Sequence, residues 1–111
     1  MGDMLRRAVV LVVLAGLPVA AYAQTLYGSL VGNVTDPSGA SVPGAKVVIV
    51  NSETAFTREA TADDRGAYLF SELPPGPYDV KVSATAFAGF TRTAVQVSIN
   101  AVVRVDVQLA L

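Results

Sequence analysis

Hydrophobic and polar residues alternate along much of the chain after residue 24. The alternation is cleanest at residues 78–85 and 102–109. A period of two is that of a β-strand with one buried face. No segment of this region combines a 3.6-residue period with helix caps. The pattern predicts seven strands, at residues 29–35, 45–52, 56–62, 67–71, 78–84, 89–99 and 102–111, and the sixth is expected to be broken near Thr93. In the two cleanest segments the side chains predicted to face the core are Tyr78, Val80, Val82, Ala84, Val103, Val105, Val107 and Leu109.

Turn signals separate these segments at short intervals. In the stretch from Asp36 to Gly39, proline fixes φ, aspartate bonds forward to the backbone and glycine tolerates positive φ. The stretch from Asp63 to Gly66 predicts a tight hairpin with Gly66 left-handed. Short strands separated by turns predict an antiparallel two-sheet β-sandwich with prealbumin-like or Ig-like Greek-key connections over residues 24–111.

The segment Pro74-Pro75-Gly76-Pro77-Tyr78 is either a polyproline ligand or a structural corner. Gly76 interrupts a polyproline helix, and core strands flank the segment on both sides. We therefore predict a corner: Leu73 enters the core, the prolines end the fourth strand, and Pro77 blocks pairing until Tyr78.

One strand breaks the alternation. In residues 45–52, Ala45, Val47 and Ile49 are predicted to face the core, which leaves Val48 and Val50 on the outer face. Valine is a common outer-face β-former. The second interpretation is a docking face for a neighbouring domain.

The first 23 residues have the organisation of a secretory signal peptide. Arg6 and Arg7 precede an apolar stretch over residues 8–19, and Ala21-Tyr22-Ala23 forms a cleavage site before Gln24. The alternative, a membrane anchor, needs about 20 apolar residues, more than this interrupted stretch supplies. We expect an exported chain without a membrane span in its mature part, located outside the cytoplasm.

Composition then removes several classes of chemistry. The chain has no cysteine or histidine, which excludes Cys/His zinc sites, thiol nucleophiles and histidine-based triads. Its net charge of −1 is not that of a basic nucleic-acid-binding domain. Calcium binding by Asp63, Asp64 and Glu72 is the remaining metal hypothesis. Since a hairpin explains these acids better, we expect no metal, no cofactor and no catalysis.

Exposed aromatic rings are the usual contacts of sugar sites on β-sandwiches. Phe87 and Phe90 lie in the loop-like stretch Ala-Phe-Ala-Gly-Phe and are the candidates for carbohydrate contact. The alternative is that both rings close one end of the sandwich.

Four motifs together resemble one known family. They are Gly32-x-Val34-x-Asp36-x-x-Gly39, Pro43-Gly44-Ala45-x-Val47, Asp64-x-Gly66-x-Tyr68-x-Phe70 and Leu73-Pro74-Pro75-Gly76-x-Tyr78. This combination resembles the carboxypeptidase regulatory-like domain family, whose fold is a transthyretin-like or carbohydrate-binding-like sandwich. The order of a signal peptide followed at once by this domain resembles the N-terminal extension of Oar-like TonB-dependent outer-membrane receptors.

The resemblance implies a non-catalytic interaction module. Its expected partners are neighbouring receptor domains or another envelope protein. The alternatives are a carbohydrate-binding module that uses Phe87 and Phe90, and an accessory domain of a secreted enzyme. A glycan array separates the first alternative from the docking role.

Overall fold

The computed structural model describes residues 26–111, and the predicted signal peptide lies outside the described residues. The described part contains eight strands and no helix. Within it, accordingly, no helix has the length and apolar character that crossing a membrane requires. The strands are β1 Gly28–Thr35, β2 Lys46–Asn51, β3 Thr57–Thr61, β4 Ala67–Leu73, β5 Gly76–Ser83, β6 Phe90–Val97, β7 Val102–Arg104 and β8 Val107–Gln108.

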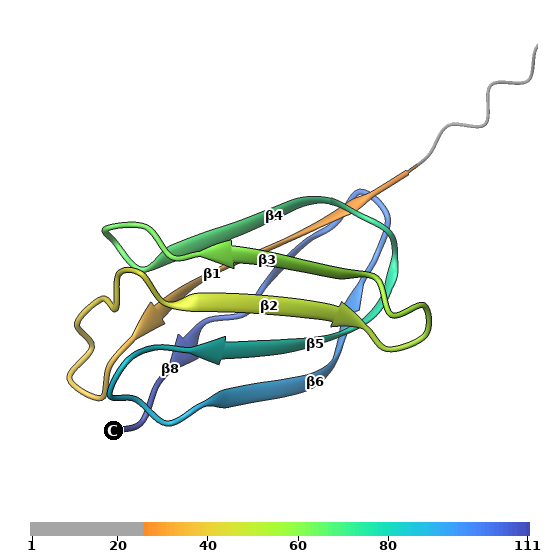
Figure 1. Ribbon diagram of the computed structural model, residues 1–111. Coiled ribbons are helices and arrows are strands. Elements are labelled where there is room, and N and C mark those ends of the chain that lie inside the picture. Colours follow the sequence, from red (N-terminus) through yellow and green to blue (C-terminus); the bar gives the residue numbers. More distant parts are fainter. Residues whose placement is uncertain (1–25) are drawn as a thin grey trace, which may run out of the picture.

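The strands form two sheets packed face to face (Figure 1). One sheet has the order β4-β1-β7, with β8 also pairing β1, and the other has the order β3-β2-β5-β6. The predicted two-sheet β-sandwich is confirmed. The predicted last strand is divided into β7 and β8, and Val105 and Asp106 lie between them.

The first sheet is mixed, whereas the sequence predicted antiparallel pairing throughout. β1 pairs β4 antiparallel but pairs β7 and β8 in parallel. The chain reverses between β6 and β7 and changes sheet there, so β7 arrives beside β1 running in the same direction (Figure 1). Alternation with one wet face is typical of antiparallel sheets, but it does not decide the pairing of each individual strand. The parallel neighbours of β1 were therefore not predictable from it.

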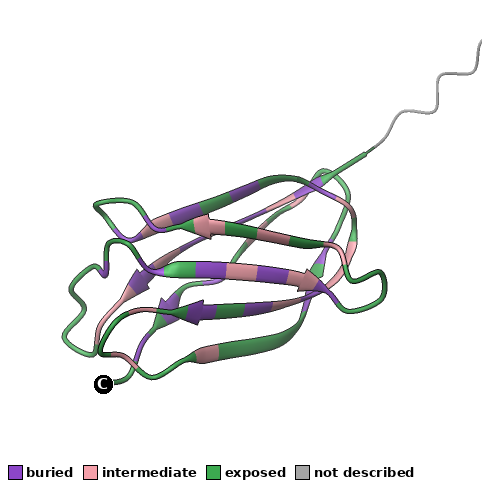
Figure 2. Cartoon of the chain, viewed as in Figure 1, coloured by how far each residue is buried: buried purple, intermediate pink, exposed green. Residues whose placement is uncertain are grey.

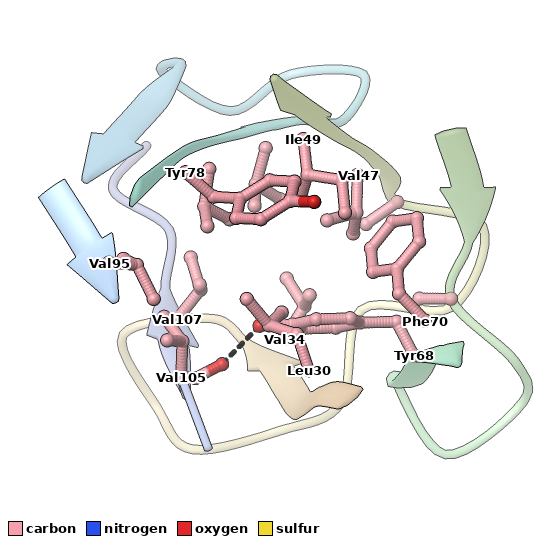
Figure 3. Packing of buried hydrophobic residues seen from close by; sticks show 14 of the residues in the cluster. Leu30, Val34, Val47, Ile49, Tyr68, Phe70, Tyr78, Val95, Val105 and Val107 are labelled. Carbon is pink, nitrogen blue, oxygen red and sulfur yellow. Dashed lines mark hydrogen bonds between the residues drawn. The ribbon is translucent and has the colours of Figure 1, made fainter. Parts of the chain in front are cut away.

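The core lies between the two sheets, as Figure 3 shows. Inward side chains of β2 and β5 face those of β1 and β4, and the rings of Tyr68 and Phe70 meet edge to face with centroids 6.0 Å apart. Burial in β1, β2 and β5 alternates as the sequence pattern predicted. The fully buried side chains are Tyr78, Phe70, Leu30, Ile49, Leu73, Leu109, Val34, Val47, Val80, Val82, Val97 and Val107.

The gap between β7 and β8 is fixed by contacts with Gly32 and Tyr68. The Val105 backbone approaches so closely that a Cβ on Gly32 would lie 1.9 Å from the Val105 carbonyl oxygen. The Tyr68 hydroxyl donates a hydrogen bond to the same oxygen (Figure 3). In addition, the Asn33 N–H donates to Asp106 Oδ1 at 3.0 Å, which satisfies a β1 donor within the gap. Glycine is needed at position 32 because no side chain fits there.

The proline corner is present, but its boundaries differ from those predicted. Leu73 is 0% exposed, as expected, and β4 runs through it. The prediction that Pro77 delays pairing until Tyr78 was wrong: β5 starts at Gly76, and Pro77 pairs with Gln96 of β6. On the β2 side the Pro77 carbonyl accepts the Ser52 N–H at 3.1 Å, but proline has no N–H to donate back. The β2–β5 ladder therefore ends at Tyr78, whereas pairing with β6 on the other side is unaffected.

The predicted interruption of the sixth strand near Thr93 is confirmed as a β-bulge. The β5–β6 register shifts between Tyr78 and Val80, so two β6 residues, Thr93 and Ala94, stand opposite Asp79. Ala94 has φ of 56°, a left-handed conformation that is uncommon for a residue with a Cβ.

Candidate interaction surfaces

The two valines expected to form a docking face lie on the outer surface of the β3-β2-β5-β6 sheet. Val48 and Val50 are half-buried. Val48 lies between Glu59 of β3 and Lys81 of β5, and Lys46 on the same strand pairs with Glu59 at 3.5 Å. Long charged side chains therefore surround Val48. The docking role of these valines remains a prediction.

The more exposed apolar side chains lie on the opposite sheet. Leu69 of β4 is 62% exposed and Val102 of β7 is 69% exposed. Val31 of β1 lies beside Leu69 and is half-buried. We call Val31, Leu69 and Val102 the apolar face. This face was not predicted from the sequence, although Leu69 lies between two aromatic residues that face inward and must therefore face outward.

A polar cluster borders the apolar face. Arg104 stands next to Val31 in the β1–β7 register, and its guanidinium donates to Asp106 Oδ2 at 3.0 Å and to Asn33 Oδ1 at 2.7 Å. The Asn33 Nδ2 donates to the Arg65 carbonyl oxygen at 3.3 Å. These groups satisfy one another, so we assign the cluster a structural role.

The two phenylalanines expected as sugar contacts lie at the opposite end of the sandwich from the proline corner. Phe87 and Phe90 are half-buried and pack against the core cluster. The Phe87 loop is tied to the end of the chain by the Ala88 N–H, which donates to the Ala110 carbonyl at 2.8 Å. The Arg92 guanidinium carbon lies 5.6 Å from the centroid of the Phe90 ring. Both rings thus have packing roles, and only part of each remains for a sugar.

The acids considered for calcium are placed in turns. Asp63 Oδ1 accepts hydrogen bonds from the N–H groups of Arg65 at 2.8 Å and Ala67 at 2.9 Å, and Gly66 has φ of 73°, as the predicted hairpin requires. Glu72 lies at the far end of β4 from this hairpin. In residues 26–111 no group of three or more acidic, histidine or cysteine side chains could hold a metal ion.

Three exposed carboxylates have pKa values below the usual value. The Ser38 hydroxyl and the backbone N–H groups after it lower the pKa of Asp36. The N–H groups of Ala67 and Arg65 lower the pKa of Asp63. At Asp106 partial desolvation opposes ionisation, but the Asn33 N–H and Arg104 outweigh it and lower the pKa.

We expect the free energy of unfolding to fall as the pH drops below the ordinary aspartate pKa of 3.8 and through the lowered folded-state values. Carboxylates with lowered folded-state pKa values stabilise the fold fully above their unfolded pKa, and this contribution is lost as the pH falls through the folded value. Urea unfolding at several pH values measures the effect. Asp63→Asn should be less stable than the wild type at pH 7 and show a weaker pH dependence. Equal acid sensitivity of the two proteins would contradict this account.

Comparison with known proteins adds a family to this geometry. The carboxypeptidase regulatory-like domain family matches residues 29–110. The TonB-dependent transporter Oar of Myxococcus xanthus is 32% identical over 100 residues, which cover 88% of this chain and 9% of the transporter. The chain thus spans about a tenth of that relative's length.

Solved structures with the same fold are more distant in sequence. The TIE protein of Bacillus anthracis has a TM-score of 0.66 and 19% identity, covering 77% of this chain and 16% of its own. A candidate carbohydrate-binding protein of Pseudomonas aeruginosa has a TM-score of 0.56 and 20% identity, covering 84% of this chain and 97% of its own. At these identities the likeness shows the fold alone. The family match over residues 29–110, together with the 32% identity to the transporter, establishes that the chain belongs to the carboxypeptidase regulatory-like domain family.

Proposed function

We propose that this chain is a non-catalytic interaction domain of the bacterial envelope, acting as the N-terminal periplasmic domain of a TonB-dependent outer-membrane receptor. The observation that carries the proposal is the 32% identity to a TonB-dependent transporter over 88% of the chain. The signal-peptide pattern of residues 1–23 supports export.

The placement of the polar side chains supports a non-catalytic role. The sequence contains no histidine or cysteine, so general-base and nucleophile chemistry would depend on other groups. The Asp36 and Asp63 carboxylates bind backbone N–H groups of their own turns. Burial raises the pKa of Tyr68 to about 12, which keeps its hydroxyl protonated as the donor to Val105. Each of these groups has a structural task.

The apolar face is the surface that best fits contact with another part of the receptor. Leu69 and Val102 expose most of their side chains on a sheet whose other face is fully packed. Val31 and Leu69 are neighbours on the adjacent strands β1 and β4, and Val102 lies on β7 beside Ser29 of β1. An exposed apolar patch is typical of an interaction site. In the transporter relative, about nine-tenths of the polypeptide lies outside the matched segment. We propose that a receptor domain corresponding to part of this remainder covers the apolar face.

The absence of native cysteine permits a direct test. The full chain with Leu69→Cys should be recovered from the envelope fraction and should crosslink, through a thiol-reactive photocrosslinker, to a polypeptide identified by mass spectrometry as part of a TonB-dependent receptor. Val48→Cys, on the opposite sheet, is the matched control and should crosslink at least five-fold less. Retention of the chain in the cytoplasm would refute export. Preferential crosslinking from Val48→Cys would move the docking surface to the valines of β2.

A further inference from the structure

The four outer strands of the two sheets differ in how much of their backbone is free to pair. β3 and β6 form the edges of one sheet, and β4 and the β7–β8 segment form the edges of the other. β6 has eight residues, β3 has five, β7 has three and β8 has two. An edge strand presents unpaired N–H and C=O groups to any extended chain that reaches it. An edge can therefore bind another chain only where contacts within this chain leave its N–H and C=O groups free.

The β4 edge is blocked at both ends. The backbone groups of Ala67 that point away from β1 bond to Asp63: its N–H reaches Asp63 Oδ1 at 2.9 Å, and its carbonyl accepts the Asp63 N–H at 2.9 Å. Four residues after Ala67, the Arg58 guanidinium donates to the Ser71 carbonyl at 2.6 Å. Only Leu69 between them keeps its outward groups free of these contacts. A partner strand has little of β4 left to pair with.

The β6 edge is open on both sides of its bulge. The Pro77 carbonyl accepts the Ser52 N–H, so Pro77 faces β2, and the next residue, Tyr78, faces β6. Its partner Val95 then faces β5, and Gln96 must direct its N–H and C=O away from the sheet. The same alternation beyond the bulge directs the groups of Thr91 outward. In Figure 2 most of β6 is coloured as exposed, in contrast to its neighbour β5.

The charges beside this edge are mainly positive. Arg92 lies opposite Val80 and therefore on the core-facing side of the sheet. Its guanidinium carbon lies 5.6 Å from the centre of the Phe90 ring. Lys81 lies opposite Thr91 on the outer face. Within residues 26–111, the two ion pairs are Lys46–Glu59 and Arg104–Asp106, so neither Arg92 nor Lys81 has a carboxylate partner there. The half-buried Asp79, opposite the bulge, offsets one of the two positive charges.

From these observations we infer that the free edge of β6 is a binding site for an acidic, extended segment of another protein, which adds to the sheet as a further strand. Main-chain hydrogen bonds to Thr91 and Gln96 supply the affinity, and the charge of Arg92 and Lys81 selects the segment. The bulge at Ala94 limits each run of pairing to a few residues. A second copy of this chain fits less well, because pairing two β6 strands brings the same positive charges together.

The inference rests on the proposed role as an interaction domain, but its test is independent of export and of the receptor. The probe is a capped six-residue peptide of alternating valine and aspartate, titrated into the ¹⁵N-labelled chain. We expect amide shift changes concentrated at residues 90–97 and a Kd below about 1 mM. A peptide of alternating valine and lysine should bind at least ten-fold more weakly.

Three variants test the geometry. Gln96→Pro removes the outward N–H from β6, and Thr61→Pro is the matched change at the edge of β3. Gln96→Pro should weaken binding at least five-fold, whereas Thr61→Pro should leave it unchanged. Arg92→Gln alters only an exposed side chain, so it keeps the test decisive if a proline variant fails to fold, and it should weaken binding about three-fold. Absence of shift changes, changes centred on another strand, or dimerisation through β6 would overturn the inference.

Discussion

Replacing Gly32 by alanine is expected to lower the free energy of unfolding by about 3 kcal/mol or more. A Cβ at this position would lie 1.9 Å from the Val105 carbonyl oxygen and 2.6 Å from the Tyr68 hydroxyl. Overpacking typically costs about 1–3 kcal/mol, and displacing the Tyr68 hydroxyl would leave a buried carbonyl without its donor, which adds about 1–3 kcal/mol. Urea unfolding monitored by circular dichroism measures the loss.

Gly89→Ala is the control for this prediction. A Cβ on Gly89 would meet no atom within 4 Å, and its φ lies outside the left-handed region. We expect its free energy of unfolding to stay within about 0.5 kcal/mol of the wild type. Tyr68→Phe separates the two causes in Gly32→Ala, since it removes the hydroxyl without adding a methyl group. If Gly32→Ala proved as stable as Gly89→Ala, the close approach of Val105 to β1 would be wrong.

Replacing Leu73 by alanine is expected to cost about 2–5 kcal/mol, the usual range for removing a fully buried leucine side chain. Leu73 is 0% exposed and lies at the end of β4, where it pairs with Gly28 and the prolines follow directly. The corner prevents the chain from shifting to fill the cavity, because Pro74 and Pro75 fix φ. The total stability of a domain is typically about 5–15 kcal/mol, so this loss is large.

Leu69→Ala is the matched change on the same strand. Leu69 is 62% exposed, so its truncation leaves no cavity and should change the free energy of unfolding by less than about 0.5 kcal/mol. Thermal unfolding of both variants gives the comparison. A loss at Leu69 as large as that at Leu73 would show that the apolar face is covered by the chain itself, and the docking role proposed for it would then fail.

The corner and the turns were predicted correctly because their residues act locally. Proline fixes its own φ, and aspartate reaches its own turn: Asp36 Oδ1 accepts the N–H of Ser38 at 2.9 Å. Gly39 and Gly66 have φ of 86° and 73°, as the turn motifs required. The error at Pro77 arose because its effect depends on which neighbour its missing N–H would have faced. That neighbour, β2, is supplied by a distant part of the chain.

The candidate surfaces were predicted less completely than the fold. Val48 and Val50 were correctly placed on an outer face, since strand alternation alone decides this. Their charged surroundings depend on cross-strand partners from β3 and β5. The apolar face combines residues of β1, β4 and β7 that are far apart in sequence. The free edge of β6 differs from that of β4, whose outward backbone groups bond to Asp63 and Arg58, and this difference depends on the folded structure.

The sequence by itself determined the strand content, the turns, the inward-facing residues and the family, because alternation and turn chemistry are properties of neighbouring residues. Only the tertiary structure decided that β7 and β8 run parallel to β1, that Gly32 is required by the approach of Val105, and which edges and faces remain free. The first two features depend on contacts between β1 and the end of the chain, and the third depends on the order of the strands in each sheet. Strand periodicity carries no information about either.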